Sequence, residues 1–231
     1  TVQDFNKDET MPLLNAEDML KMNLVVLDIE GSGGSQRNDP YGTGSIVSLG
    51  AVDFNTKDEF YEECRVMEGR GYDPQALAVN GFTKEQIFDK SKQSVLELLA
   101  KFEGFCKMHG SSLLGSWGLY DLKMLVAAYA YYAREWGLPR SYVNLKSISK
   151  MLLGEKKSGL SNTAMKLNMP PEQHPHIGIN GARLTAECTS ILLFGRHYSD
   201  EYNAYAIPEL PRSKPKLQAT DMGAYINHKS R

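Results

Sequence analysis

The chain has 231 residues, with 26 lysine and arginine side chains against 28 aspartate and glutamate side chains and a formal net charge of −2. This length suffices for one sizeable domain with its own core, and the charge excludes a nucleic-acid partner held by a field over the whole surface. Contact with a polyanion would need a local basic patch. The three cysteines, Cys64, Cys106 and Cys188, lack CxxC spacing and are odd in number, which argues against a disulfide framework or a zinc site.

Targeting signals are not apparent in the sequence. No apolar run reaches the ~18 residues that a transmembrane helix needs, and the first residues lack the basic-then-apolar order of a signal peptide. We therefore expect no membrane partner and an intracellular location, cytoplasmic or nuclear, which includes that of a viral protein acting in its host cell.

The first half of the chain favours strands. The polar residues 1–22, with a small amphipathic piece at Ala16–Met22, are expected to form an N-terminal extension. Apolar and alternating patterns then predict an antiparallel meander, because a turn at 55–58 separates two of three strand-like runs. The predicted strands are Leu24–Glu30, Ile46–Phe54 and Glu59–Val66.

The second half mixes helices with short strands. Thr83 and Gln86 form a predicted capping box, and apolar residues recur at helical spacing from Val95 to Cys106. Further helices are predicted at Tyr120–Trp136, Leu160–Leu167 and Ala182–Phe194, and short strands at Ser112–Ser116 and Tyr142–Leu145. This order predicts an α/β domain over residues 23–205, in which a mixed sheet, an antiparallel meander followed by short parallel strands, is flanked by helices.

The last segment, residues 206–231, is expected to be a basic C-terminal tail. Pro215 opposes helix formation there, and Asp221 is the one acid among the charged residues from Arg212 onwards. Two interpretations stay open: a solvated flexible tail, or a basic arm that helps to hold a polyanion. The basic residues are Arg212, Lys214, Lys216, Lys229 and Arg231.

The segment Leu27-Asp28-Ile29-Glu30-Gly31-Ser32-Gly33-Gly34 follows the apolar run Leu24-Val25-Val26 and allows two functions. A phosphate-binding loop needs its glycines at a strand-to-helix turn, but this segment runs into another strand and its acids would repel phosphate. On a strand, Asp28 and Glu30 instead point to the same side. Two adjacent carboxylates at the end of an apolar strand favour a hard divalent ion such as Mg²⁺ or Mn²⁺, unless one of them is simply exposed.

Two further residues extend this candidate site. Asp121 stands at a predicted helix start after a short apolar strand, where an acid also serves as an ordinary helix cap. His176 lies on a loop that leads into the last predicted helix, where a lone histidine is more often structural than catalytic. Neither residue decides the function alone.

Taken in order, these motifs resemble one known family. Residues 23–195 are similar to the DEDDh 3′-5′ exonucleases, the DnaQ-like branch of the ribonuclease H-like fold. The Ser116-Trp117-Gly118 and His176-x-Gly178-Ile179 forms look most like the RNA-trimming members, which favours RNA over DNA. The residues that carry the resemblance are Asp28-Ile29-Glu30, Val79-Asn80-Gly81-Phe82-Thr83, Ser116-Trp117-Gly118 through Asp121 to Leu125, and His176 to Arg183.

The resemblance implies a hydrolase acting on single-stranded nucleic acid with a free 3′ end, by two-metal catalysis with Mg²⁺ or Mn²⁺. It implies that Asp28 bridges both ions, that Glu30 binds the water-activating ion and that Asp121 supports the second. His176 would be the general base. Backbone around Gly31 and Ser32 would lie near the terminal nucleotide, because glycines let the chain approach a ligand closely.

One position departs from the family pattern. Five residues after His176 the family carries its fourth metal-binding aspartate, whereas this chain has Gly181, preceded by Asn180. One ion would then be held less tightly. Three explanations stay open: an active enzyme that recruits Asn180, water or another acid such as Glu187; a variant inactivated by substitution; or a noncatalytic protein that binds nucleic acid or a protein partner.

Overall fold

The computed structural model describes residues 13–33, 44–154, 159–211 and 215–222. Their centre is a seven-stranded sheet in the order β1-β7-β6-β5-β2-β3-β4. β5 pairs in parallel with β2 and β6, while β2, β3 and β4 form the predicted antiparallel meander and β7 runs antiparallel to β1 and β6. The strands are β1 (Leu13–Leu14), β2 (Leu24–Gly31), β3 (Ile46–Asp53), β4 (Glu59–Glu63), β5 (Leu113–Ser116), β6 (Ser141–Asn144) and β7 (Leu217–Asp221).

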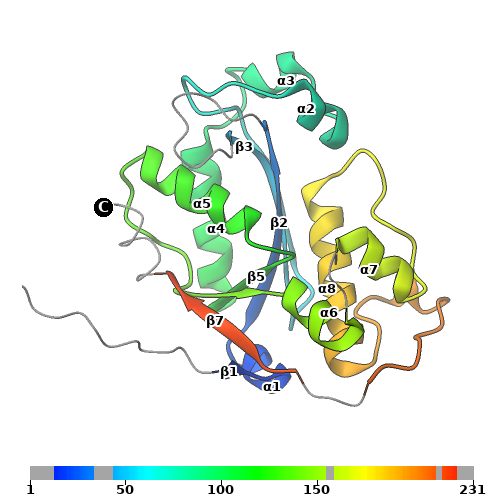
Figure 1. The fold of residues 1–231 in the computed structure, drawn as a ribbon. Coiled ribbons are helices and arrows are strands. Elements are labelled where there is room, and N and C mark those ends of the chain that lie inside the picture. The colour runs from blue at the N-terminus through cyan, green and yellow to red at the C-terminus, as the bar shows by residue number, and fades with distance from the viewer. Residues whose placement is uncertain (1–12, 34–43, 155–158, 212–214, 223–231) are drawn as a thin grey trace, which may run out of the picture.

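Helices cover both faces of the sheet. Figure 1 shows α4 and α5 on one face and α6, α7 and α8 on the other, with α2 and α3 near the end of β3. This three-layer arrangement confirms the predicted fold class. The helices are α1 (Ala16–Lys21), α2 (Pro74–Asn80), α3 (Lys84–Phe88), α4 (Val95–Met108), α5 (Tyr120–Tyr131), α6 (Lys146–Leu153), α7 (Leu160–Lys166) and α8 (Gly178–Phe194), followed by a 3-10 turn at Asp200–Tyr202.

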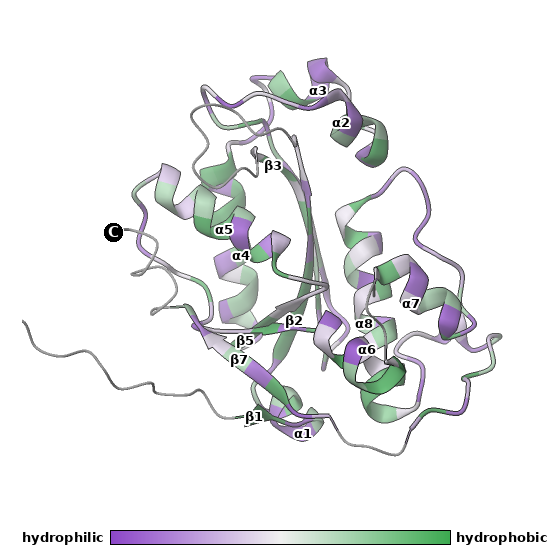
Figure 2. Cartoon of the chain, viewed as in Figure 1, coloured by the Kyte–Doolittle hydropathy of each residue, from purple (hydrophilic) through white to green (hydrophobic). Residues whose placement is uncertain are grey.

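Two apolar cores sandwich β2, because successive side chains of a strand point to opposite faces. Val25, Leu27 and Ile29 pack into the core beneath α4 and α5, while Leu24 and Val26 pack into the core beneath α6, α7 and α8. In Figure 2 the middle of β2 is hydrophobic, whereas the helices alternate between hydrophobic and hydrophilic residues. Any functional side chain at an even position near the end of β2 therefore faces α8.

Several boundaries differ from the sequence-based ones. α5 ends at Tyr131, five residues before the predicted end, and Ala133 just beyond it adopts a left-handed φ of 48° that a helix cannot continue. The helical pattern from Thr83 to Cys106 is interrupted, and α4 starts with its own capping box at Ser94. α8 begins at Gly178, four residues earlier than predicted, and α2 and α6 were not predicted as helices.

The predicted tail contributes to the sheet. For Leu217–Asp221 the expectation of a solvated segment is wrong, because these residues form β7 between β1 and β6 and bury Leu217 and Ala219. Lys216 is exposed beside this strand. The domain boundaries stay predictions, and the remaining basic residues of the tail, Arg212, Lys214, Lys229 and Arg231, lie outside the described residues.

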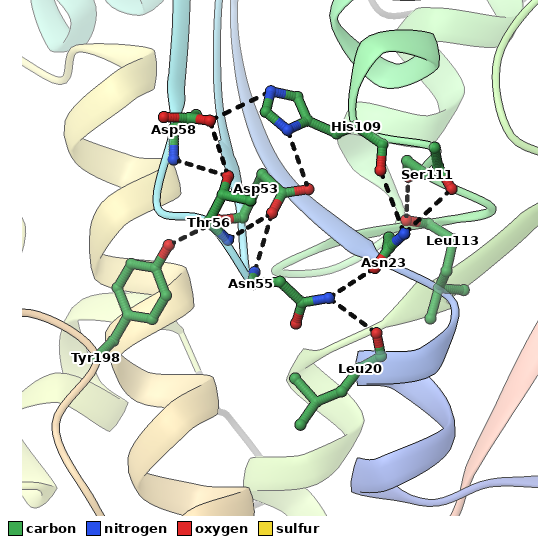
Figure 3. Close-up of polar contacts among 11 residues, drawn as sticks. Leu20, Asn23, Asp53, Asn55, Thr56, Asp58, His109, Ser111, Leu113 and Tyr198 are labelled. Atoms are coloured by element: carbon green, nitrogen blue, oxygen red, sulfur yellow. Dashed lines mark hydrogen bonds and ion pairs between the residues drawn. The ribbon is translucent and has the colours of Figure 1, made fainter.

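A polar cluster fixes the end of the sheet where β2 begins (Figure 3). Asp53 Oδ1 accepts hydrogen bonds from the backbone N–H groups of Asn55 and Thr56, which closes the turn between β3 and β4. The Asn55 amide donates to Asn23 Oδ1 at 2.7 Å, and Asn23 in turn donates to the carbonyl of His109 at the end of α4. Polar side chains thus hold together the end of the sheet at which β2 begins.

α8 starts in direct contact with the sheet, at a point where both partners are glycines. A Cβ added to Gly50 of β3 would lie 2.1 Å from the backbone nitrogen of Ile179, and one added to Gly178 would lie 3.0 Å from the carbonyl oxygen of Asp28. Backbone can approach backbone this closely only without side chains between them. The contact between Gly50 and Gly178 therefore places the first turn of α8 directly beside the carboxyl end of β2.

We predict that Gly50→Ala lowers the free energy of unfolding by about 1–3 kcal/mol or more, because the new methyl group must push α8 off the sheet. The control is Gly104→Ala in the exposed middle of α4, where an added Cβ meets nothing within 4 Å. That change should stabilise by about 0.5–1 kcal/mol through helix propensity. Urea unfolding of both variants measures the difference, and equal effects would contradict the contact's role.

Candidate metal centre

The carboxyl end of β2 presents two acids on one face. Asp28 pairs with Gly50 and Glu30 with Ser48 of β3, and the register shifts between Glu30 and Gly31, where the strand leaves the sheet. Both carboxylates lie on the face that carries α8, in line with Leu24 and Val26. The predicted same-side arrangement of Asp28 and Glu30 is therefore present.

Asp121 reaches the same place from α5. It is buried in the first turn of that helix, and its Oδ1 accepts a hydrogen bond of 3.0 Å from the backbone N–H of Ile29. Ile29 lies between Asp28 and Glu30, so this bond fixes the start of α5 against the acidic end of β2. A helix-cap role alone does not account for it.

His176 arrives on the loop between α7 and α8, which is attached at two points. The backbone N–H of His176 donates to the carbonyl of Val79 in α2, and the backbone N–H of Glu172 donates to Ser161 Oγ in α7. A Cβ on Gly81 would lie 2.6 Å from the Pro175 ring, so the end of α2 packs tightly on this loop. The loop thus holds both Glu172 and His176 over the end of β2.

These side chains line one cavity of about 360 Å³. Of the residues predicted from the sequence, the structure brings together Asp28, Glu30, Asp121, His176 and Gly31, and it adds Glu172, which no sequence motif indicated. Its signal was weak, since Glu172 is a single acid four residues before His176 in a proline-containing loop. The remaining lining residues are Ile29, Gly33, Ala76, Val79, Asn80, Trp117 and Tyr120.

Two other predicted residues take different positions. The Ser32 side chain is buried: its hydroxyl donates to the carbonyl of Gly71 and accepts from the backbone N–H of Ser45. Asn180 lies outside the cavity, with its Oδ1 accepting a hydrogen bond of 3.3 Å from Arg183. Their predicted roles in nucleic-acid and metal binding stay predictions.

The acids of this cavity repel one another in a poorly solvated place. Burial raises the pKa of Asp28 well above its usual range, and the charge of Asp121 raises it further. Burial also raises the pKa of Glu30 to about 7, with the charge of Glu172 adding to the shift. The pKa values of Asp121 and Glu172 are raised mainly by burial as well. Such a group of acids ionises fully only when cations compensate the charge.

His176 differs from these acids because burial, together with the neighbouring His174, lowers its pKa. The two imidazole rings stack with centroids 4.5 Å apart. A lowered pKa keeps the His176 ring neutral near pH 7, the form that accepts a proton. Its Nδ1 lies 3.7 Å from a carboxylate oxygen of Glu172.

Solved structures share this architecture. The nuclease domain of 3′hExo, a DEDDh family member bound to rAMP, matches with a TM-score of 0.59 at 17% identity, over 80% of this chain and 96% of that one. The chain has the fold of the DEDDh 3′-exonucleases. A 3′-exonuclease described with the 3′ end of a histone mRNA stem-loop matches with a TM-score of 0.62 at 16% identity, over 87% and 91% of the chains.

A further protein with the DEDDh fold is exonuclease X in complex with 5′ overhanging duplex DNA. It matches with a TM-score of 0.50 at 18% identity, over 74% of this chain and 91% of that one. No protein-family model and no curated protein matches the sequence. Among the residues that the structure describes, no helix is both long and apolar enough to cross a membrane.

The raised pKa of Glu30 predicts that the metal-free protein loses stability as the pH rises. Unfolded Glu30 releases its proton near 4.5 and the folded form near 7, so the folded state binds more protons between these values. Melting temperatures in EDTA should therefore fall from pH 5 to pH 8. Glu30 accounts for up to about 3 kcal/mol of the corresponding loss in the free energy of unfolding. Glu30→Gln should make the profile shallower, with the remaining slope due to the other acids of the cavity, while the exposed Glu209→Gln should leave it unchanged.

Proposed function

We propose that this chain is a metal-dependent 3′-5′ exonuclease that hydrolyses single-stranded nucleic acid, with RNA favoured over DNA. The observation that carries the proposal is the meeting of Asp28, Glu30, Asp121 and His176 in one cavity. These residues come from β2, α5 and the loop before α8, so parts of the chain far apart in the sequence converge there. The DEDDh fold supports the same conclusion.

The donor set fits Mg²⁺ or Mn²⁺. Hard divalent ions prefer carboxylate oxygens, and the crowded acids have raised pKa values that such ions would compensate. Asp28, Glu30 and Asp121 would hold two ions between them. When bound, the ions activate a water molecule and neutralise charge on the leaving oxygen.

The protein's own contribution to the chemistry is proton transfer and positioning. His176, kept neutral by its lowered pKa, accepts the proton of the attacking water through a ring nitrogen. The hydrogen bond from its backbone N–H to the Val79 carbonyl fixes the backbone that carries the ring. Ile29 N–H, by donating to Asp121, orients that carboxylate toward the end of β2.

The walls of the cavity suit a terminal nucleotide. Ala76 and Val79 offer apolar contacts, and Trp117 and Tyr120 offer aromatic faces for base stacking. Of the two predicted backbone contacts, Gly31 lines the cavity, while the Ser32 backbone is engaged inside the protein: its N–H donates to the Ser45 carbonyl and its carbonyl accepts from the Asp73 N–H. We therefore assign the backbone contact to Gly31.

The preference for RNA rests on the forms of two motifs. Ser116-Trp117-Gly118 and His176-x-Gly178 resemble those of RNA-trimming family members. Two of the structural neighbours are described with rAMP or with an mRNA stem-loop, whereas exonuclease X is described with DNA. A matched pair of RNA and DNA oligonucleotides tests this preference.

A second candidate function is noncatalytic binding of nucleic acid or a protein partner on the same fold. The observation that favours it is Gly181, which supplies no side-chain ligand at the family's fourth metal position. Binding without cleavage distinguishes this function from an exonuclease.

We predict that the protein shortens 5′-labelled single-stranded RNA stepwise from its 3′ end with Mn²⁺ or Mg²⁺, and that EDTA stops the reaction. Asp28→Asn should reduce cleavage to background because it removes a charged ligand, while exposed Glu209→Gln should cleave normally. Denaturing gels measure the products. Intact RNA that is nevertheless retarded in a native gel would favour the noncatalytic alternative.

We also predict that His176→Gln slows cleavage by roughly 10²–10⁴-fold while leaving Mn²⁺ binding unchanged, because a general base takes a proton and holds no ion. Single-turnover rates and calorimetric titration with Mn²⁺ measure the two effects. A parallel loss of Mn²⁺ affinity would instead make His176 a ligand.

A further inference from the structure

Gly181 lies in the first turns of α8, directly against the acids of β2. A Cβ added at this position would lie 2.3 Å from Asp28 Oδ2 and 3.0 Å from Glu172 Oε1. Separations below 3 Å from a carboxylate oxygen force that carboxylate to move. The space of a side chain at 181 is therefore taken by the Asp28 carboxylate and bordered by the Glu172 carboxylate, which would have to give way by a few tenths of an ångström.

Glu172 brings a fourth carboxylate to this space from the loop before α8. Its side chain is only 10% exposed, and donor atoms of Glu172, Glu30 and His176 all lie within 4.8 Å of one another. Ligands of one divalent ion with bonds of ~2.1 Å stand roughly 3–4 Å apart. The 4.8 Å limit on the spacing of the donor atoms lies close to this range.

The backbone of the loop explains why the Glu172 carboxylate stays there. The backbone N–H of Glu172 donates a hydrogen bond to Ser161 Oγ on α7. Four residues later, the backbone N–H of His176 donates to the carbonyl of Val79. The ion-pair distance from Glu172 to His176 Nδ1, 3.7 Å, exceeds that of a hydrogen bond. The carboxylate is thus buried and directed into the cavity while the histidine stays available for proton transfer.

The other acids and amides considered for this role are engaged elsewhere. Asn180 Oδ1 accepts from Arg183. Glu187 is buried further along α8, where its carboxylate contacts His197 Nδ1 at 2.5 Å and accepts hydrogen bonds from the backbone N–H groups of Tyr198 and Ser199. Neither side chain is directed into the cavity at the end of β2.

We propose that Glu172 is a metal ligand that replaces the carboxylate which the DEDDh pattern places at 181, and that Gly181 is the residue that makes room for it. The inference rests on the proposed function for the presence of the ions. Carboxylates at 172 and 181 are mutually exclusive, because they would share one volume and repel each other at short range. The site then retains four acids: Asp28, Glu30, Asp121 and Glu172.

Mn²⁺ binding to the full chain tests the role of Glu172. Calorimetry and electron paramagnetic resonance should show that Glu172→Gln weakens at least one ion by about tenfold or more, since even the loss of an outer-shell partner costs ~10–100-fold. The matched control is Gln173→Ala, an exposed neighbour on the same loop, which should bind Mn²⁺ like the wild type. Unchanged binding by Glu172→Gln overturns the proposal.

Melting temperatures show whether the Glu172→Gln variant is folded. Without metal, Glu172→Gln should melt at the same or a higher temperature than the wild type, because it removes one of the repelling charges. With saturating Mn²⁺, its gain in melting temperature should be smaller than that of the wild type. A full metal-induced gain also overturns the proposal.

Moving the carboxylate from position 172 to position 181 tests whether the two positions can replace each other as the metal ligand. Gly181→Asp should raise Mn²⁺ affinity in a Glu172→Ala background, where both the volume and the charge of the Glu172 carboxylate are removed, and should lower it or leave it unchanged in the wild-type background. An equal gain in both backgrounds contradicts mutual exclusion.

The two proposals fail in different ways. If the wild type binds Mn²⁺ but shortens no nucleic acid, the exonuclease proposal fails, and the titration of Glu172→Gln still decides the ligand. If the wild type cleaves and Glu172→Gln binds Mn²⁺ and cleaves like it, Glu172 is excluded as a ligand while the exonuclease proposal stands.

Discussion

The joint burial of four acidic groups, which raises the pKa of each and adds repulsion between neighbours, is the constraint on which the site depends. Asp28, Glu30, Asp121 and Glu172 would separate if their own electrostatics decided the structure. Apolar packing on both faces of β2 and the polar cluster at its far end hold the strand in place instead. The cavity therefore stores unfavourable energy in the metal-free protein, supported by interactions made elsewhere in the fold.

The sequence was most informative where a short period decides the outcome. Apolar runs located β2, β3 and the helices beneath them, and the two-residue period placed Asp28 and Glu30 on one face. β7 escaped prediction because Leu217–Asp221 is short and its register depends on β6, some 75 residues earlier in the chain. The early start of α8 was missed for a similar reason, since it rests on the close contact of Gly50 with Gly178.

The candidate site was predictable in part. Motifs identified Asp28, Glu30, Asp121 and His176, and the structure brings all four to one cavity. Glu172 was not predictable, because a lone acid in a loop acquires meaning only from the path of that loop through space. Gly181 illustrates the same limit: in the sequence it is a missing aspartate, whereas in the fold it is a position whose volume other oxygens already occupy.

The loop before α8 is tied to α2 by the hydrogen bond from His176 to Val79 and by the packing of Pro175 on Gly81. Val79 is also part of the cavity wall. A small molecule wedged against α2 at this point would displace the imidazole through the backbone without touching it. A displacement of α2 would therefore be passed through the backbone to the loop that carries His176.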